Sequence, residues 1–323
     1  MVGPNILIVT SRADSHADRL IRTVGTDRVF RWNTEDTNSD VSLTIRTSGS
    51  GKAVGSLCAH GLRTIETSGV KAVWYRKPLF DFKGAASEEN RGFAVEETRS
   101  AIDSILSLFE GAFWVNDLQS ARSARVKAQQ LSLASELGMR VPRTLITSSF
   151  DDALAFADSC PHGVAAKTIY SATAVIEGIP QAIPTQRITS DDVLLFQNSI
   201  KVCPVQLQEY VPKAHELRVT VFGREMFVAK LDSQKDARTT IDWRPDADIC
   251  PHEIVPPTSY LERFCLEFLQ RQGLVYGALD IIVTPEGEYV FLENNPFGQY
   301  LWVEDRTDAP LTRAMANLLL AAH

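Results

Sequence analysis

A single stretch, residues 277–296, constrains the fold of this chain more than any other. It reads GALDIIVTPEGEYVFLENNP, which is two apolar runs around a turn. The first run, Leu279 to Val283, is apolar and mostly β-branched, and only Asp280 interrupts it. The segment PEGE at 285–288 has turn chemistry, and the second run leads directly into ENNP. The pattern predicts a β-hairpin that carries polar side chains on largely apolar strands.

The register of this hairpin decides which polar side chains meet. A four-residue loop sets Thr284 opposite Tyr289, and counting back in twos sets Asp280 about opposite Glu293. Asn295 lies on the same face, because side chains alternate along a strand. The Cβ atoms of opposed residues are about 5 Å apart. We therefore expect two carboxylates close together on this face.

Two carboxylates in that setting repel each other and lose hydration. A hard divalent cation with oxygen ligands removes both penalties. Mg²⁺ that holds a nucleotide's phosphates suits two carboxylates and an amide, with water and phosphate oxygens completing its coordination. The alternative is a solvated hairpin with polar residues at its ends. The position of Asp280 inside the apolar run favours the metal site.

The composition is that of an ordinary soluble globular protein. The 323 residues suffice for two or three domains, and 44% of them are hydrophobic and 23% charged. A net charge of −7, without any run of Lys or Arg, argues against nucleic-acid binding. The five cysteines are scattered singly, which predicts reduced thiols and a cytoplasmic protein. The N-terminus reads as a strand rather than a signal peptide, and no apolar run approaches the roughly 20 residues that span a bilayer.

Residues 1–117 are predicted to form an open α/β domain. Apolar runs suited to strands lie at Asn5–Thr10, Val29–Trp32, Val70–Tyr75 and Phe113–Asn116, and helical spacing occupies Asp14–Val24 and Glu88–Glu110. SGSGK at 48–52 lacks the spacing of a phosphate-binding loop and is interpreted as a turn. Further on, Ser120 to Leu137 is predicted as one amphipathic helix and residues 171–185 as a mobile loop. Thr258 to Gln272 is predicted as a helix with an apolar inner face.

Several residues of the remaining chain could bind an anion or a nucleotide. Lys167 lies in a strand of small apolar residues, so it either meets phosphate or reaches out to water. Lys127, taken alone, reads as a solvated helix residue. The strand end QEYV at 208–211 could offer backbone groups to adenine and a carboxylate to ribose. Glu216 and Arg218 share a face, which suits phosphate binding or a cross-strand ion pair.

The order of these pieces resembles the ATP-grasp superfamily of carboxylate ligases. Other segments are similar, more specifically, to graspetide synthetases, which cross-link ribosomal peptides. The matching segments are WYRKP at 74–78, Asn116…Lys127…Gln130-Leu131, QEYVPKAHELRVTVFG, LDSQ at 231–234, DWR at 242–244 and LENNPFGQYLW, and they span about residues 74–302. One departure is Asn294, where the family usually has an apolar residue. It points to the other face of the strand, so the metal face should be unaffected.

The resemblance implies a mixed α/β (α+β) chain with the ATP-grasp fold. It has an N-terminal open α/β domain at 1–117, a central domain at 118–202 and a C-terminal antiparallel-sheet domain at 203–323. ATP would lie between the last two. The implied phosphate ligands are Lys127 and Lys167, the implied adenine and ribose ligands are Gln208, Glu209, Tyr210 and Val211, and Glu216 is a further nucleotide contact. Asp280, Glu293 and Asn295 would hold Mg²⁺, as two ions.

The implied reaction begins when an Asp or Glu side chain of a precursor peptide attacks the γ-phosphate of ATP and becomes an acyl phosphate. A Ser/Thr hydroxyl or a Lys amine of the same peptide then displaces phosphate, which closes an ester or amide ring. Arg218 would neutralise the developing charge. The partner would be a ribosomal precursor peptide with a leader and a Thr/Asp/Glu-rich core, and the enzyme a homodimer.

Binding of the peptide has four candidate residues. Arg244 would clamp a core carboxylate, although Trp243 could instead pack on the domain and leave Arg244 in a surface ion pair. Arg76, at the end of a strand, is a second candidate for the same anionic substrate. Lys230 and Asp232 are weaker ones, because a two-residue turn at 223–224 puts them on the face opposite Arg218.

Two other functions remain open from the sequence. One is a RimK-type ligase that joins a free amino acid to a peptide or small acid, and the other is a non-catalytic ATP-binding protein. WYRKP and DWR favour the macrocyclase. Retention of both lysines, Arg218 and the three metal ligands argues against a non-catalytic protein.

Overall fold

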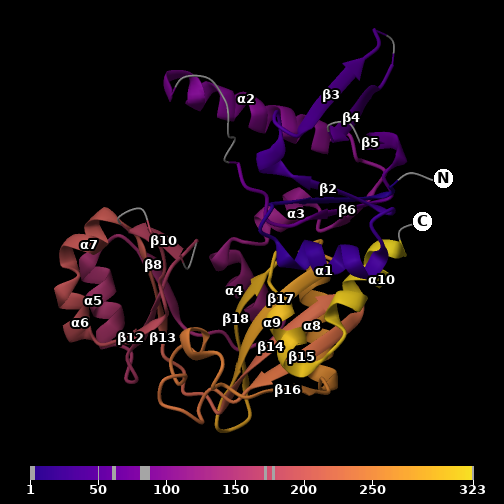
Figure 1. The fold of residues 1–323 in the computed structure, drawn as a ribbon. Coiled ribbons are helices and arrows are strands. Elements are labelled where there is room, and N and C mark those ends of the chain that lie inside the picture. Colours follow the sequence, from indigo (N-terminus) through magenta and orange to yellow (C-terminus); the bar gives the residue numbers. More distant parts are fainter. Residues whose placement is uncertain are drawn as a thin grey trace.

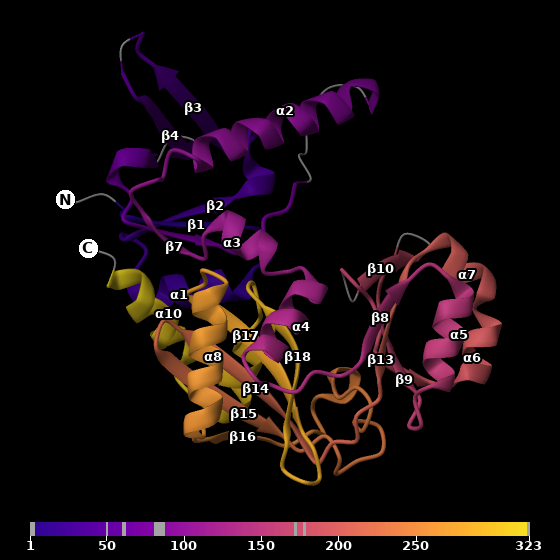
Figure 2. The ribbon, with the colours of Figure 1, turned by 180° about the vertical axis from the view of Figure 1, so that it is seen from behind.

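The computed structural model describes residues 4–49, 51–59, 63–80, 88–170, 173–176 and 179–321. The chain forms three units, each built on its own main sheet (Figures 1 and 2). The N-terminal unit lies above the C-terminal unit, and the middle unit stands to one side of the C-terminal unit. Within the described ranges, every helix is too short or too polar to cross a membrane.

The N-terminal unit contains a parallel sheet in the order β2-β1-β6-β7. Its strands are β1 (Ile6–Thr10), β2 (Val29–Asn33), β6 (Ala72–Tyr75) and β7 (Phe113–Val115), which confirms the four predicted strands. Helix α1 (Ser15–Val24) covers one face and α2 (Glu88–Leu106) the other. Side chains of β1 alternate between these two cores, as Ile6 and Ile8 pack on the α1 side and Leu7 and Val9 on the α2 side.

A separate three-stranded antiparallel sheet lies beside α2 (Figure 1). It consists of β3 (Val41–Thr47), β4 (Ala53–Ala59) and β5 (Arg63–Glu66). The SGSGK segment connects β3 to β4, and Gly51 N donates to Ser48 O across 3.0 Å, as in a turn. Ser50, in that segment, lies outside the described residues.

The middle unit is an antiparallel sheet in the order β12-β9-β13-β8 with helices on one face. The strands are β8 (Thr144–Thr147), β9 (Val164–Lys167), β12 (Gln186–Ile188) and β13 (Val205–Glu209), and the helices are α5 (Phe150–Asp158), α6 (Ser190–Leu195) and α7 (Gln197–Val202). Because β13 pairs with both β8 and β9, this unit continues past residue 202, where we placed its boundary. We therefore propose that it ends after Glu209.

The described part of the segment predicted as a mobile loop, 171–185, contains a hairpin followed by three irregular residues, 183–185. β10 (Thr173–Ile176) pairs with β11 (Ile179–Ala182) as an antiparallel hairpin. Residues 171–172 and 177–178 lie outside the described residues. Small residues and prolines suggested a loop, but an exposed two-stranded hairpin also tolerates them.

The C-terminal unit is a five-stranded antiparallel sheet in the order β16-β15-β14-β17-β18. The strands are β14 (His215–Phe222), β15 (Glu225–Leu231), β16 (His252–Val255), β17 (Tyr276–Val283) and β18 (Tyr289–Asn295). Helix α8 (Ser259–Arg271) covers one face, as predicted, and α3 (Leu118–Ser123) and α4 (Lys127–Glu136) join the same core. The single helix expected at Ser120–Leu137 is therefore wrong, because the chain leaves the helix between Ser123 and Lys127.

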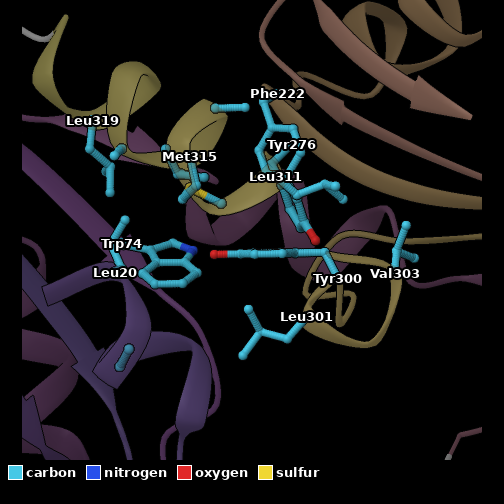
Figure 3. Packing of buried hydrophobic residues seen from close by; sticks show 14 of the residues in the cluster. Leu20, Trp74, Phe222, Tyr276, Tyr300, Leu301, Val303, Leu311, Met315 and Leu319 are labelled. Atoms are coloured by element: carbon cyan, nitrogen blue, oxygen red, sulfur yellow. The ribbon is translucent and has the colours of Figure 1, made fainter. Parts of the chain in front are cut away.

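A continuous apolar core joins the N-terminal and C-terminal units. Helices α9 (Leu301–Thr307) and α10 (Leu311–Leu320) lie between α1, β6 and the five-stranded sheet. Figure 3 shows Leu20 and Trp74 of the N-terminal unit beside Tyr300, Met315 and Leu319, all of them buried. This packing fixes the N-terminal unit to α9 and α10, the helices that follow β18.

Candidate active site

The predicted hairpin is the β17–β18 pair, and Asp280 faces Glu293 as expected. Nearer the turn the register differs from the prediction, because Val283 rather than Thr284 pairs with Tyr289. Asn295 pairs with Ala278 and thus shares the face of Asp280. The two carboxylates and the amide therefore lie together on one face of the sheet.

A β-bulge reconciles the two registers. Ile281 pairs with Phe291, whereas Asp280 pairs with Glu293, so Leu292 is one extra residue in β18. Without it, the observed turn would place Leu292 opposite Asp280 and turn Glu293 into the α8 core. The predicted pairing of the carboxylates is thus confirmed, although the register near the turn was wrong.

Each carboxylate is neutralised by a cation from another element. Lys127 Nζ, at the first residue of α4, contacts Glu293 Oε2. Arg218 Nη1, on β14, donates to Asp280 Oδ1 and Oδ2 over 2.8 and 2.9 Å. Asn295 Nδ2 donates to Glu293 Oε1 over 3.0 Å. The Asp280 and Glu293 side chains each remain 33% exposed, so their oxygens are accessible from the adjoining space.

The two carboxyl groups titrate in opposite directions. Burial raises the pKa of Asp280, and repulsion by Glu293 raises it further. The attraction of Arg218 lowers it, but not enough to cancel the other two effects. Burial acts on Glu293 as well, but the Lys127 ammonium outweighs it and lowers the pKa of Glu293 to about 2. A further cation near Asp280 would therefore stabilise its ionised form.

The donor set fits Mg²⁺ better than a softer metal. Among the described residues, no three His, Cys, Asp and Glu side chains gather into a cluster that could hold a metal ion by themselves. Two carboxylates and the Asn295 amide oxygen offer only hard ligands. Mg²⁺ commonly uses one or two carboxylates and takes its other ligands from water and phosphate. The residues present therefore fit a metal that arrives with a phosphate ligand.

Lys167 faces this carboxylate face from the middle unit. It lies at the end of β9, and its Nζ donates to Gln208 Oε1 over 2.7 Å. Burial lowers the pKa of Lys167, while the charges of Glu293, Glu216 and Asp280 oppose that shift. A desolvated ammonium is well suited to an anion such as phosphate, which would offset the cost of its burial.

The other residues of the QEYV segment take different directions. Gln208 is buried and also donates to Thr144 Oγ1 over 3.1 Å. Glu209 lies on the opposite face of the sheet from Lys167, and its carboxylate accepts from Arg143 Nε over 2.7 Å. Its predicted ribose contact would require the carboxylate to leave Arg143. Tyr210 lies under the Arg187 guanidinium, 4.4 Å from the ring centroid.

Two neighbouring residues complete the nucleotide candidates. Val211 is buried against Ile282 and Val290 of the β17–β18 hairpin, so the chain leaving the middle sheet packs directly on the C-terminal sheet. Glu216 Oε1 accepts from Lys213 Nζ over 2.5 Å. Its charge acts on both Lys167 and Asp280, which places it with them.

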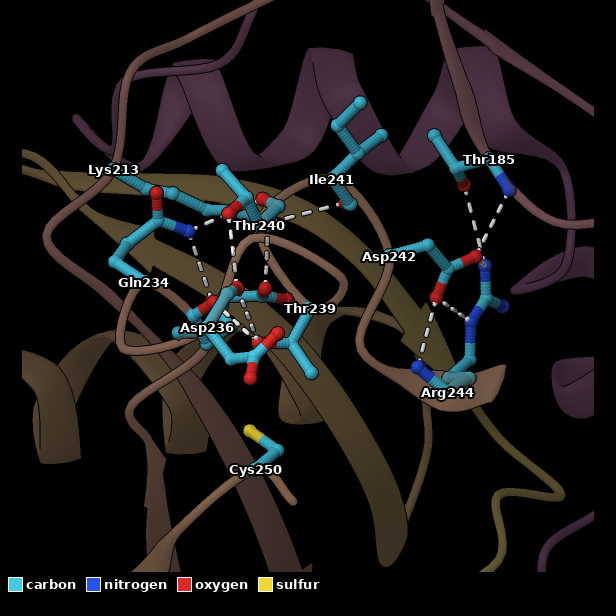
Figure 4. A network of polar contacts seen from close by, with 12 residues as sticks. Thr185, Lys213, Gln234, Asp236, Thr239, Thr240, Ile241, Asp242, Arg244 and Cys250 are labelled. Carbon is cyan, nitrogen blue, oxygen red and sulfur yellow. Dashed lines mark hydrogen bonds and ion pairs between the residues drawn. The ribbon is translucent and has the colours of Figure 1, made fainter. Parts of the chain in front are cut away.

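Arg244 lies on a loop that internal hydrogen bonds hold in shape (Figure 4). Its Nε and Nη2 bind Asp242 over 2.7 and 2.6 Å, and Nη2 also reaches Thr185 Oγ1 at 3.2 Å. Lys213 Nζ contacts the carbonyl of Ile241 and thereby ties this loop to Glu216. The Arg244 side chain remains 51% exposed, and the charges of Asp280 and Glu293 help to raise its pKa.

Trp243 packs on its own unit, which is one of the two arrangements that the sequence allowed. Its ring lies 4.8 Å from Trp302 and 5.4 Å from His252 between ring centroids. Trp302 in turn lies under Arg218, 5.9 Å from its guanidinium. The loop of Arg244 and the side chain of Arg218 therefore rest on one aromatic cluster.

The remaining substrate candidates lie elsewhere. Lys230 pairs with Leu217 and so faces away from Arg218, as the two-residue turn predicted. Its Nζ contacts Asp232 and Glu253 at 3.1 and 2.9 Å. Arg76 is 3% exposed and binds Asp14 at 2.8 Å, so its guanidinium is already paired inside the protein. Burial opposes ionisation of Asp14, yet its hydrogen bond with His16 and the charge of Arg76 hold its pKa well below the usual range.

Two amides that the sequence analysis named only as part of a matching pattern hold the strand of Glu293 and Asn295 in position. Gln130 Nε2 donates to Asn294 O over 2.9 Å, and Asn294 N donates to Gln130 Oε1 over 2.8 Å. Asn116 Nδ2 donates to the carbonyls of Tyr276 and Pro296 over 2.9 and 3.0 Å. Asn294, the residue that departs from the family pattern, points to the α8 side and contacts Gln272, so it leaves the metal face as expected. A buried Gln in an otherwise apolar stripe was the available signal.

Comparisons with known proteins agree with this geometry. Residues 5–122 match a family model described as the MvdD pre-ATP grasp domain. The chain is similar to a RiPP-associated ATP-grasp ligase of Chryseobacterium gregarium, solved in complex with ADP and a leader and core peptide. The TM-score is 0.88 at 26% identity, over 99% of this chain and 97% of that one.

Two macrocyclases of Microcystis aeruginosa MRC are also similar. MdnC, solved with the precursor peptide MdnA, gives a TM-score of 0.85 at 26% identity over 98% of this chain and 100% of that one. MdnB gives 0.78 at 28% identity over 98% of each. A comparison with curated protein sequences found no match. The similarity extends over all three units, so the expected ATP-grasp fold is confirmed.

Proposed function

We propose, from the premise that this chain is an ATP-grasp ligase of the graspetide synthetase family, that it closes rings in a ribosomal precursor peptide at the expense of ATP. The observation that carries the proposal is the Asp280–Glu293 pair. Lys127 and Arg218 contact its carboxylates directly, and the charges of both carboxylates act on Lys167 of the middle unit. Carboxylates and cations in that arrangement suit a nucleotide triphosphate with its metal.

In this proposal Lys127 and Lys167 bind phosphate oxygens, and the strand end Gln208 to Val211 with Glu216 borders the nucleotide. Asp280, Glu293 and Asn295 hold Mg²⁺, as two ions. When bound, the metal would supply positive charge that offsets the charge of the phosphate oxygens. Lys127 and Arg218, which neutralise the carboxylates in the structure described here, would then turn to phosphate.

The chemistry has two steps. A side-chain carboxylate of the peptide attacks the γ-phosphorus, the bond to the β-phosphate oxygen breaks, and ADP leaves. A Ser/Thr hydroxyl or Lys amine of the same peptide then attacks the acyl carbon, loses its proton, and expels inorganic phosphate. Each ring costs one ATP and removes one water from the peptide. Arg218 offsets the developing negative charge, and holding both groups together gives effective molarities of roughly 10⁵ M or more in well-oriented cases.

Co-expression with a small acidic reading frame encoded beside this chain tests the proposal. We expect the peptide to lose one water mass per link, with equal ADP release. A gain of one amino-acid mass would instead indicate the RimK-type ligase, and absence of ADP release a non-catalytic protein. Light scattering of the purified protein tests the homodimer that forms part of the proposal.

Gln130 offers a test of how β18, the strand of Glu293 and Asn295, is positioned. Gln130→Met should raise the Mg²⁺ concentration for half-maximal ADP release about fivefold or more. The backbone of Asn294, which lies between Glu293 and Asn295, loses both of its hydrogen bonds to Gln130. Exposed Gln129, on the same helix, provides the control variant Gln129→Met. An unchanged Mg²⁺ requirement in a folded Gln130→Met protein would show that the amide is only structural.

A further inference from the structure

A cavity of about 410 Å³ lies between the N-terminal unit and helix α9. Its charged lining comprises Asp14, Arg19, Arg76, Lys77, Asp305 and Arg306. The cations outnumber the carboxylates, although the whole chain is acidic. The cavity therefore concentrates positive charge at one place on a molecule of net charge −7.

Most of these cations already have partners. Arg76 binds Asp14 at 2.8 Å, and Arg19 binds Asp305 at 2.5 Å. Arg306 binds Asp248 at 2.8 Å, outside the cavity lining. Lys77 differs, since no described residue forms an ion pair or hydrogen bond with its Nζ.

The surroundings of Lys77 disfavour its charge. Although Lys77 is an exposed residue, partial desolvation of its side chain lowers its pKa, and the neighbouring Arg76 guanidinium lowers it further, while Asp14 opposes the shift. Asp14 is already committed to Arg76 through both carboxylate oxygens. An anion that entered the cavity would relieve the repulsion between Lys77 and Arg76.

The cavity adjoins the candidate active site through one short segment. Gln299 and Trp302 line the cavity. The carbonyl of Gln299 accepts from Arg218 Nη2 over 3.1 Å, and the Trp302 ring lies 5.9 Å from the Arg218 guanidinium. Arg218 therefore contacts two residues of the cavity lining as well as the Asp280 carboxylate.

We propose that this cavity, through Lys77, binds a carboxylate of the precursor peptide other than the one being activated. The inference rests on the proposed function, because it needs a peptide with several carboxylates. One acidic group would sit beside Arg218 while another is held at Lys77, which sets the direction and spacing of the peptide. The carboxylate comes either from a core side chain or from the peptide's C-terminus.

Kinetics with the precursor of the co-expression assay provide the main test. Lys77→Met should raise the peptide KM about tenfold or more and leave the KM for ATP within about twofold, because a charge-assisted contact to the peptide is lost. Lys77→Glu should raise the peptide KM further, and Lys77→Arg should restore most of the affinity. Lys71→Met is the matched control, since Lys71 is exposed like Lys77, precedes the strand β6 that Lys77 follows, and does not line the cavity.

Peptide variants identify the source of the carboxylate. If a core side chain is bound, one Glu→Gln or Asp→Asn change in the peptide should abolish the penalty of Lys77→Met. If the C-terminus is bound, amidation should do so. A penalty that no peptide change removes, or a peptide KM unchanged in Lys77→Glu, overturns the inference.

A binding measurement separates this inference from the proposed function. Acetyl-Thr-Glu-Thr-Glu-Thr-amide and its Gln counterpart are titrated by NMR against the wild type and Lys77→Glu. We expect only the Glu peptide to bind the wild type, and about tenfold more weakly to Lys77→Glu. Binding of this kind by a protein that forms no rings would sink the proposed function alone. Equal binding to both proteins would sink the cavity site alone.

Discussion

Asp280→Asn and Glu293→Gln should each reduce ADP release by about 100-fold or more while the fold persists. Each change removes one negative ligand from the face that Asp280, Glu293 and Asn295 share. Under the proposed function the phosphate charge then lacks its metal, and Lys127 or Arg218 loses its ionic partner. Circular dichroism and a coupled assay for ADP measure the two properties on the same preparation.

Glu288→Gln is the matched control for the carboxylate variants. Glu288 precedes β18 in the same hairpin, is exposed, and pairs with Arg140 at the surface. Removing it should leave ADP release within about twofold, because surface ion pairs contribute little. Near-normal ADP release from either Asp280→Asn or Glu293→Gln would exclude these carboxylates as metal ligands.

Arg218→Lys should lower peptide dehydration at least about tenfold and change nucleotide affinity far less. The Arg218 guanidinium spans two partners, because Nη1 holds both oxygens of Asp280 and Nη2 holds the carbonyl of Gln299. A lysine keeps the charge but has a single nitrogen and no planar fork, so it cannot keep this geometry. Calorimetry with a non-hydrolysable nucleotide and mass spectrometry of the peptide separate the two effects.

A surface arginine gives the control for this variant. Arg271 pairs with Glu136 at 2.6 Å, and both side chains are largely exposed. Arg271→Lys should leave dehydration unchanged. If Arg218→Lys instead abolishes nucleotide binding while bound ATP still turns over normally, Arg218 is a ground-state nucleotide ligand and its proposed role in acyl transfer is wrong.

Apolar runs and helical spacing predicted the strands and helices that bury one regular face. The strands of the N-terminal sheet were found because buried parallel strands are short apolar runs, as Ile6–Thr10 shows. Helix α8 was found because its buried side chains recur at helical spacing. The break between α3 and α4 was missed, since the apolar spacing continues through it. There the Gln130 amide binds the Ala124 carbonyl over 2.6 Å, a contact the spacing does not reveal.

The substrate candidates also depended on contacts that local patterns do not reveal. WYRKP suggested that Arg76 was available to an anion, because a strand end usually opens to solvent. The structure instead pairs Arg76 with Asp14, which lies 62 residues away in sequence, and with the carbonyl of Gly298. Lys77, the next residue of the motif, lines the same cavity as Arg76, but no described residue pairs with its Nζ.

The sequence by itself indicated the class of chemistry, because alternation along the second strand places Glu293 and Asn295 on one face and Asp280 is the only polar residue inside the apolar run of the first. Only the tertiary structure decided the details of that face. The bulge at Leu292 fixes which residue meets Asp280, and Lys127 meets Glu293 only because α4 packs beside β18. The reason is physical: side-chain alternation is a property of the local backbone, whereas a bulge, a helix break and a buried ion pair are settled by contacts between segments distant in the chain.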